Sequence, residues 1–104
     1  MSDEIYIPVE EALNMLDTLS EFLVKDYNEH AVFINRYEPY HEEILSKLVE
    51  KIKEAEDKKE EWEGFSIIKS FYKNNGKDKI TVIGKVMKVK DKDKDCLEFS
   101  IEWM

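Results

Sequence analysis

Three short stretches of the sequence contain residue types that bind metals or act as nucleophiles. Glu38 and His41 have the i, i+3 spacing of one half of a two-iron carboxylate site, but no second Glu-x-x-His follows. Aspartates alternate with lysines over residues 91–95, as ligands alternate in a calcium loop, but Cys96 stands where that loop needs a glycine for its sharp turn. Cys96 has no evident base beside it, since the neighbouring charged residues belong to a polar loop. We therefore expect no metal, no cofactor and no catalytic residue.

A fourth pattern, Arg36-x4-His41, resembles the arginine–histidine pair of HEPN ribonucleases, in which both side chains line a cleft between helices, usually at a dimer interface. The resemblance covers six residues. It implies a ribonuclease in which Arg36 and His41 act together. Two departures count against it: Pro39 lies between the pair, and the second part of the chain has the pattern of a sheet, whereas HEPN domains are helical.

The composition favours one small domain that spans residues 1–104. Charged residues make up 38% of the chain, well above the usual quarter, and the net charge is −8. Residues 1–64 carry a net charge of −11, whereas residues 65–104 carry +3. An anionic surface repels nucleic acid and anionic lipid and attracts basic proteins. We therefore expect a protein partner with a basic surface, and neither nucleic acid nor a membrane.

Two further features favour a cytoplasmic location. The single cysteine excludes an intrachain disulfide. The N-terminus is acidic and lacks the apolar core of a signal peptide, and no apolar run approaches the length that spans a membrane.

The helical part is expected over residues 8–63. Apolar residues recur at spacings of three and four from Val9 onward. A break near Asn28 would divide this segment, so it forms one helix or two. Pro39 marks the start of a further helix, and Gly64 is its expected stop.

After the helical part, the apolar period changes to two, which predicts a β-meander over residues 65–104. Asn75-Gly76 predicts a tight hairpin, and the polar residues 91–95 form the second connection. The expected fold class is α+β, with two helices, or three, packed on one face of a three-stranded antiparallel sheet. A short N-terminal edge strand over residues 5–7 is an additional possibility.

Three regions are candidates for a partner-binding surface: an aromatic corner, the acidic face of the second predicted helix and the uncovered face of the sheet. Tyrosine and arginine are enriched in binding hot spots, and both occur at the corner that precedes the second predicted helix. The helices cover only one face of the sheet, so apolar residues on the other face remain exposed, which favours a homodimer or another protein partner. The last strand, residues 97–103, is expected to present an open edge for strand addition. The candidate residues are Tyr27, Phe33, Arg36, Tyr37, Tyr40 and His41 at the corner, Glu42, Glu43, Glu50, Glu54 and Asp57 on the helix, and Tyr72 and Met87 on the sheet.

The favoured hypothesis is a non-enzymatic acidic protein that occupies a partner's surface as a stoichiometric inhibitor or adaptor. Immunity proteins, antitoxins and phage-encoded anti-defence proteins share this size and charge. In one version, the carboxylates of the second predicted helix imitate the phosphates of nucleic acid. The alternative is a homo-oligomeric protein that binds a small ligand such as a nucleotide or metabolite. A ribonuclease that uses Arg36 and His41 is the least favoured hypothesis.

Overall fold

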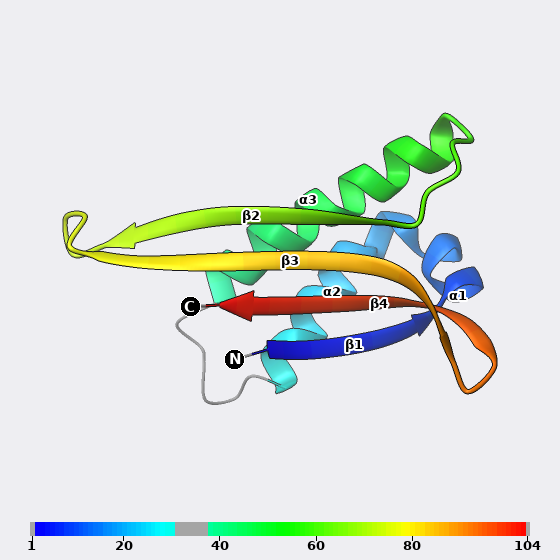
Figure 1. Cartoon of the computed structure of the whole chain (residues 1–104), viewed down its shortest axis with the longest axis horizontal. Coiled ribbons are helices and arrows are strands. Elements are labelled where there is room, and N and C mark those ends of the chain that lie inside the picture. Colours follow the sequence, from blue (N-terminus) through cyan, green and yellow to red (C-terminus); the bar gives the residue numbers. More distant parts are fainter. Residues whose placement is uncertain (1, 31–37, 104) are drawn as a thin grey trace.

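The computed structural model describes residues 2–30 and 38–103, and it confirms the α+β class. Helices lie behind one face of an antiparallel sheet, and the other face of the sheet is open toward the viewer in Figure 1. The elements in chain order are β1 (Ser2–Pro8), α1 (Val9–Asn14), α2 (Leu16–His30), α3 (Glu38–Asp57), β2 (Gly64–Lys73), β3 (Asp78–Asp91) and β4 (Lys94–Trp103).

The sheet has four strands in the order β1-β4-β3-β2, one more than the meander that we expected. The N-terminal edge strand is present and longer than residues 5–7, because Ser2–Pro8 pair with Glu102–Cys96 of β4. The last strand therefore lies between β1 and β3 and has no open edge, so the prediction of strand addition at residues 97–103 was wrong. The edges of the sheet are β1 and β2.

The two hairpins differ in length. In the β3–β4 hairpin, Asp91 pairs with Lys94, which leaves only Lys92 and Asp93 in the turn. Both turn residues have positive φ (50° and 66°), as a type I′ turn requires. The polar segment 91–95 therefore belongs mostly to the strands. The β2–β3 hairpin has a four-residue turn, in which Gly76 has φ 85°.

The described residues of the helical part form three helices, with a break at Met15, and α2 continues through Asn28 to His30. α3 ends at Asp57, several residues before the expected stop at Gly64. Lys59 adopts φ 55°, and the amide of Glu60 donates to the Ala55 carbonyl at 2.9 Å. This is the hydrogen-bond pattern of a Schellman motif, in which a left-handed residue terminates a helix.

The core lies between the helices and the covered face of the sheet. Ile5, Val82, Val86, Phe99 and Ile101 alternate inward along β1, β3 and β4 and are buried against α1, α2 and α3. Of the described helices, none is long and apolar enough to cross a membrane.

The close approach of α3 to the sheet depends on Gly84. A Cβ atom at this position would lie 2.2 Å from the Ile44 Cγ2 atom of α3. Such a distance is far inside van der Waals contact, so only glycine allows α3 to pack this closely on β3.

Candidate protein-binding surfaces

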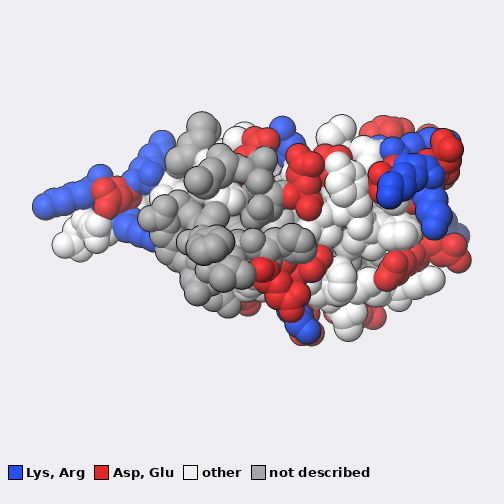
Figure 2. Space-filling model, turned by 90° about the horizontal axis from the view of Figure 1, so that it is seen from below, with Lys and Arg blue, Asp and Glu red and all other residues white. Residues whose placement is uncertain are grey.

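The charges are distributed unevenly over the molecule. In Figure 2, lysines gather at the end of the β2–β3 hairpin, whereas acidic side chains lie along the middle of the visible surface. At the opposite end, lysines and acids are intermixed around the β3–β4 turn. The sequences of the described helices α1, α2 and α3 contain more acidic than basic residues.

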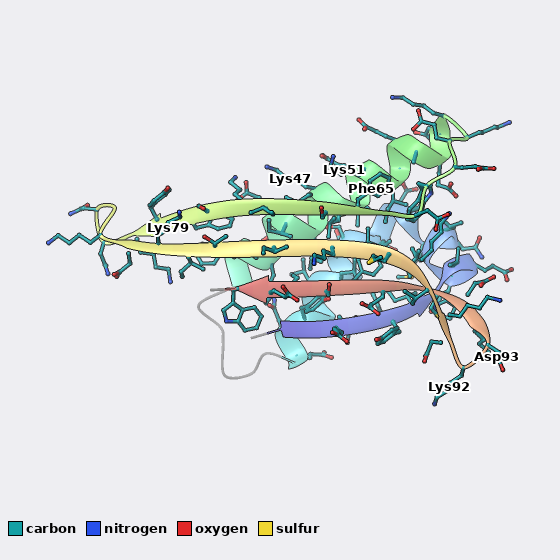
Figure 3. The ribbon with its side chains drawn as sticks, in the orientation of Figure 1. Lys47, Lys51, Phe65, Lys79, Lys92 and Asp93 are labelled. Carbon is teal, nitrogen blue, oxygen red and sulfur yellow. The ribbon has the colours of Figure 1, made fainter. Side chains whose placement is uncertain are left out.

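The acidic residues of α3 are interleaved with lysines. Figure 3 labels Lys47 and Lys51, which lie on α3 beyond the β2 edge of the sheet. Glu43, a predicted contact residue, is engaged within the chain: it accepts a hydrogen bond from Lys69 of β2, and Lys47 Nζ lies 3.6 Å from its Oε1 atom. The Lys69 ammonium group, with Lys47 nearby, holds the pKa of Glu43 below its ordinary value.

The other predicted contact residues of α3 are accessible to a partner. Glu42, Glu50, Glu54 and Asp57 are all exposed. Because Glu43 is already paired, the row of carboxylates on α3 is less continuous than a nucleic-acid mimic requires.

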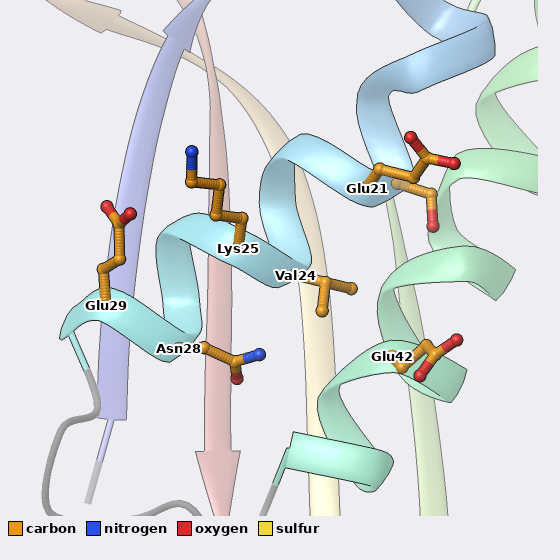
Figure 4. Close-up of a pocket in the computed structure, with 7 residues that line it drawn as sticks. Glu21, Val24, Lys25, Asn28, Glu29 and Glu42 are labelled. Atoms are coloured by element: carbon orange, nitrogen blue, oxygen red, sulfur yellow. The ribbon is translucent and has the colours of Figure 1, made fainter.

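A pocket of about 550 Å³ lies between α2 and the beginning of α3. Its lining residues are Ser20, Glu21, Val24, Lys25, Asn28, Glu29 and Glu42. In Figure 4, Val24 and Asn28 point from α2 toward α3, which carries Glu42. Lys25 and Glu29 lie on the other side of α2. The lining residues thus include three carboxylates, one ammonium group and the apolar side chain of Val24.

The helices α1 and α2 carry a denser negative charge than α3. They contain six acidic residues against one basic residue, Lys25, whereas α3 contains seven acidic residues against three lysines. Sequence reasoning concentrated on α3 and missed Glu21 and Glu29. The ratio of acids to lysines within each predicted helix was the signal that would have found them.

The predicted aromatic corner is divided between core and surface. Tyr27 and His41 are buried, and their ring centroids lie 5.8 Å apart. The Tyr27 hydroxyl donates to the carbonyl oxygen of Phe99, and the His41 ring lies 6.0 Å from that of Trp103. These side chains join the helices to β4, so Tyr27 and His41 offer a partner no exposed surface. Phe33, Arg36 and Tyr37 lie outside the described residues.

Tyr40 occupies the boundary of this region. It is half-buried on Phe71 of β2, with ring centroids 4.2 Å apart, and Lys73 Nζ lies 5.3 Å from its ring centroid. Tyr40 therefore holds the start of α3 against the β2–β3 hairpin.

The second accessible surface is the open face of the sheet. Five large hydrophobic side chains of the described residues are exposed, and four of them lie on this face: Ile68 (68%), Tyr72 (64%), Met87 (49%) and Tyr6 (46%). Tyr72 and Met87 are predicted contact residues. The fifth, Phe22 (40%), lies on α2.

The charges on the open face are arranged by strand. β3 contributes Lys79 and Lys85, whereas β4 contributes Glu98 and Glu102 and β1 contributes Glu4. Tyr6 lies beside Glu98 and Glu4, and hydrogen bonding to the Glu98 carboxylate, with the nearby negative charges, raises the Tyr6 pKa to about 12. A hollow of about 360 Å³ lies at the β2 edge, lined by Glu63, Gly64, Phe65, Ser66, Lys85 and Met87.

Within the described ranges, no three histidine, cysteine, aspartate or glutamate side chains converge to hold a metal ion. Comparisons with protein-family models, curated proteins and solved structures found no match to this chain.

Proposed function

We propose that this chain is a non-enzymatic acidic protein-binding module of the cytoplasm, which occupies the surface of a basic partner as a stoichiometric inhibitor or adaptor. Immunity proteins, antitoxins and phage anti-defence proteins act in this way. The observation that carries the proposal is the pocket between α2 and α3, whose lining includes the exposed carboxylates Glu21, Glu29 and Glu42.

The chemistry of this pocket suits the side chain of an arginine or lysine. Carboxylates form charge-assisted hydrogen bonds with guanidinium and ammonium groups. The methyl groups of Val24 supply apolar surface for the aliphatic part of such a side chain. The net charge of −8 would also accelerate the encounter with a basic protein at low salt.

The small-ligand alternative is supported by the volume of the same pocket, which lies within the usual range for ligand sites, roughly 300–1,000 Å³. Four of its seven lining residues are charged and exposed, and the pocket is open to solvent, whereas small-molecule sites enclose most of their ligand. The openness of the pocket therefore favours a protein partner. The ribonuclease hypothesis gains no support, because His41 is buried in the core.

The proposal is tested by capture from an extract of the native host. The tagged wild-type chain is compared with the variant Glu21→Gln/Glu29→Gln/Glu42→Gln at low and high salt. The control is Glu60→Gln/Glu61→Gln/Glu63→Gln, which removes the same charge from exposed positions after α3. Thermal unfolding of each variant establishes that the fold is retained.

We expect the wild-type chain and the control to retain one stoichiometric basic partner at low salt and to release it as salt rises. The pocket variant should lose the partner even at low salt. Equal losses in the two variants would show that net charge alone attracts the partner, and would contradict a role for the pocket. Failure of the wild-type chain to retain any partner would contradict the proposed function.

A further inference from the structure

We propose that the open face of the sheet binds the same face of a second copy of this chain, so that two sheets stack around a two-fold axis. This inference concerns a different surface from the pocket between α2 and α3. It rests on the exposed apolar residues of the face. It also rests on a shape and a charge pattern that are complementary to those of the same face in a second copy.

The shape match follows from the register of the strands. Gly64, Met87, Glu98 and Tyr6 lie in one row across the open face, because each pairs with the next. A two-fold axis parallel to the strands, midway between β3 and β4, places β1 of the second copy over β2. Tyr6 of the second copy then lies over Gly64, where the hollow of about 360 Å³ is situated. The exposed phenol of one copy is thus positioned to fill the hollow of the other.

The charge match follows from the same axis, which also places β3 over β4 of the second copy. Lys85 pairs with Ser100 within the chain, so Lys85 lies over Ser100 of the second copy. The residues on either side of Ser100 on this face are Glu98 and Glu102. Each Lys85 therefore meets two carboxylates, and the two-fold symmetry repeats the arrangement on the other side.

The available area is sufficient for a modest interface. Four strands of seven to fourteen residues form the sheet. With strands about 4.8 Å apart and about 3.3 Å per residue, the shared part of the face measures roughly 19 Å by 25 Å, or about 500 Å² per copy. About 1,000 Å² buried in total is at the lower limit for a specific interface. We therefore expect a dimer that dissociates in the micromolar range, on the order of 1–100 µM.

This arrangement leaves the helices on the two outer sides of the dimer. Each copy would still present Glu21, Glu29 and Glu42 to solvent. The dimer would therefore offer two acidic pockets, which would strengthen binding to a partner that has two basic sites.

The first test is the mass of the purified chain by sedimentation velocity across a range of concentrations. We expect a shift from 12.4 kDa toward twice that mass as the concentration rises. Met87→Ser on the open face should raise the dissociation constant about tenfold or more, because Met87 lines the hollow that receives Tyr6 of the second copy. Phe22→Ser is the matched control, because it removes an exposed hydrophobic side chain from the helical side and should leave the mass unchanged.

The second test exchanges charges between copies. Lys85→Glu and Glu102→Lys should each weaken the homodimer about tenfold, because each places like charges face to face. An equimolar mixture of the two variants should form dimers more readily than either variant alone. The reversed charges at positions 85 and 102 meet each other at one site, and the unchanged Lys85 meets Glu98 and Glu102 at the other. Native mass spectrometry with one isotope-labelled variant would detect these heterodimers. Lys51→Glu on α3 is the control for the charge change and should not affect dimerisation.

A wild-type chain that remains monomeric at millimolar concentration would overturn the proposal. A dimer that is insensitive to Met87→Ser, or a mixture that dimerises no better than the separate variants, would overturn it as well. None of these results would affect the pocket proposal, because capture of the basic partner depends on α2 and α3. A pocket variant that no longer captures the partner but still dimerises would show that the two surfaces act independently.

Discussion

The two faces of this sheet are built from alternate residues of the same four strands, yet only one is buried. On the covered face, Val86 and Phe99 are fully enclosed by the helices. On the open face, Met87 and Ile68 are equally apolar but remain exposed. Hydrophobicity therefore does not separate the faces. Their difference arises from what lies against each one.

The charged residues differ between the faces in the same way. On the covered face, Lys69 reaches Glu43 of α3, and Lys88 Nζ lies 4.1 Å from the ring centroid of Trp62. These lysines are therefore engaged by the helical side of the same chain. On the open face, Lys85 is exposed. It pairs with Ser100 of β4, which lies between Glu98 and Glu102 on the same face. The open face thus has the composition of a surface that meets another protein, with apolar contacts and separated charges.

The largest expected effect is a difference in the free energy of unfolding between variants of two adjacent residues of β3, one on each face of the sheet. Gly84→Ala introduces a methyl group against Ile44 on the covered face, so we expect a loss of about 1–3 kcal/mol in the free energy of unfolding. Lys85→Ala changes the open face and should alter that free energy by less than about 0.5 kcal/mol. Urea unfolding at a concentration where the chain is monomeric measures both. Similar losses for the two variants would contradict the asymmetry of the faces.

A smaller effect is expected from the removal of one hydroxyl group. The buried Tyr27 hydroxyl donates to the Phe99 carbonyl and joins α2 to β4. Tyr27→Phe should therefore cost about 1 kcal/mol of unfolding free energy. Tyr72→Phe makes the same change on the open face, where the ring is exposed, and should have almost no effect in urea unfolding. A loss in Tyr72→Phe as large as that in Tyr27→Phe would show that the open face is also held by contacts within the chain.

Local sequence patterns predicted most of the helices and strands, and also that one face of the sheet is left exposed. The change in apolar period located β2, β3 and β4, and the apolar residues on both sides of β3 correctly predicted an exposed surface. The order of the strands was not predictable in this way, because the pairing of Ser2–Pro8 with β4 joins opposite ends of the chain. The end of α3 was missed because Lys59, a residue with no preference for positive φ, occupies the position that glycine usually holds.

The candidate sites were less predictable than the fold. Tyr27 and His41 have the residue types of a binding hot spot, and only the packing against Trp103 and Phe99 shows that they belong to the core. Conversely, Tyr6 and Lys85 became candidates only because of the strand register. The register places Tyr6 in the same row as Met87, and it places Lys85 opposite Ser100. Residue type indicates which side chains can bind, but the strand register decides which of them lie together.

The smallest expected effect concerns the proton of Tyr6 on the open face. Its pKa of about 12 exceeds the ordinary tyrosine value of about 10, because the Glu98 carboxylate beside the phenol favours the protonated form. The negative charge of Glu4, to whose Oε2 atom the hydroxyl donates at 3.4 Å, acts in the same direction. From about pH 10 to pH 12, the unfolded chain has lost this proton while the folded chain retains it. The stabilisation is therefore complete below about pH 10 and is lost as the pH rises toward 12.

The wild-type chain should lose more stability over this interval than Tyr6→Phe, in which the group is absent. Tyrosinate absorbance, measured as the difference between the wild-type chain and Tyr6→Phe, reports the pKa directly. A value near 10 in that difference titration would mean that Tyr6 turns away from Glu98, which would also remove the ordered phenol that the sheet-to-sheet dimer requires.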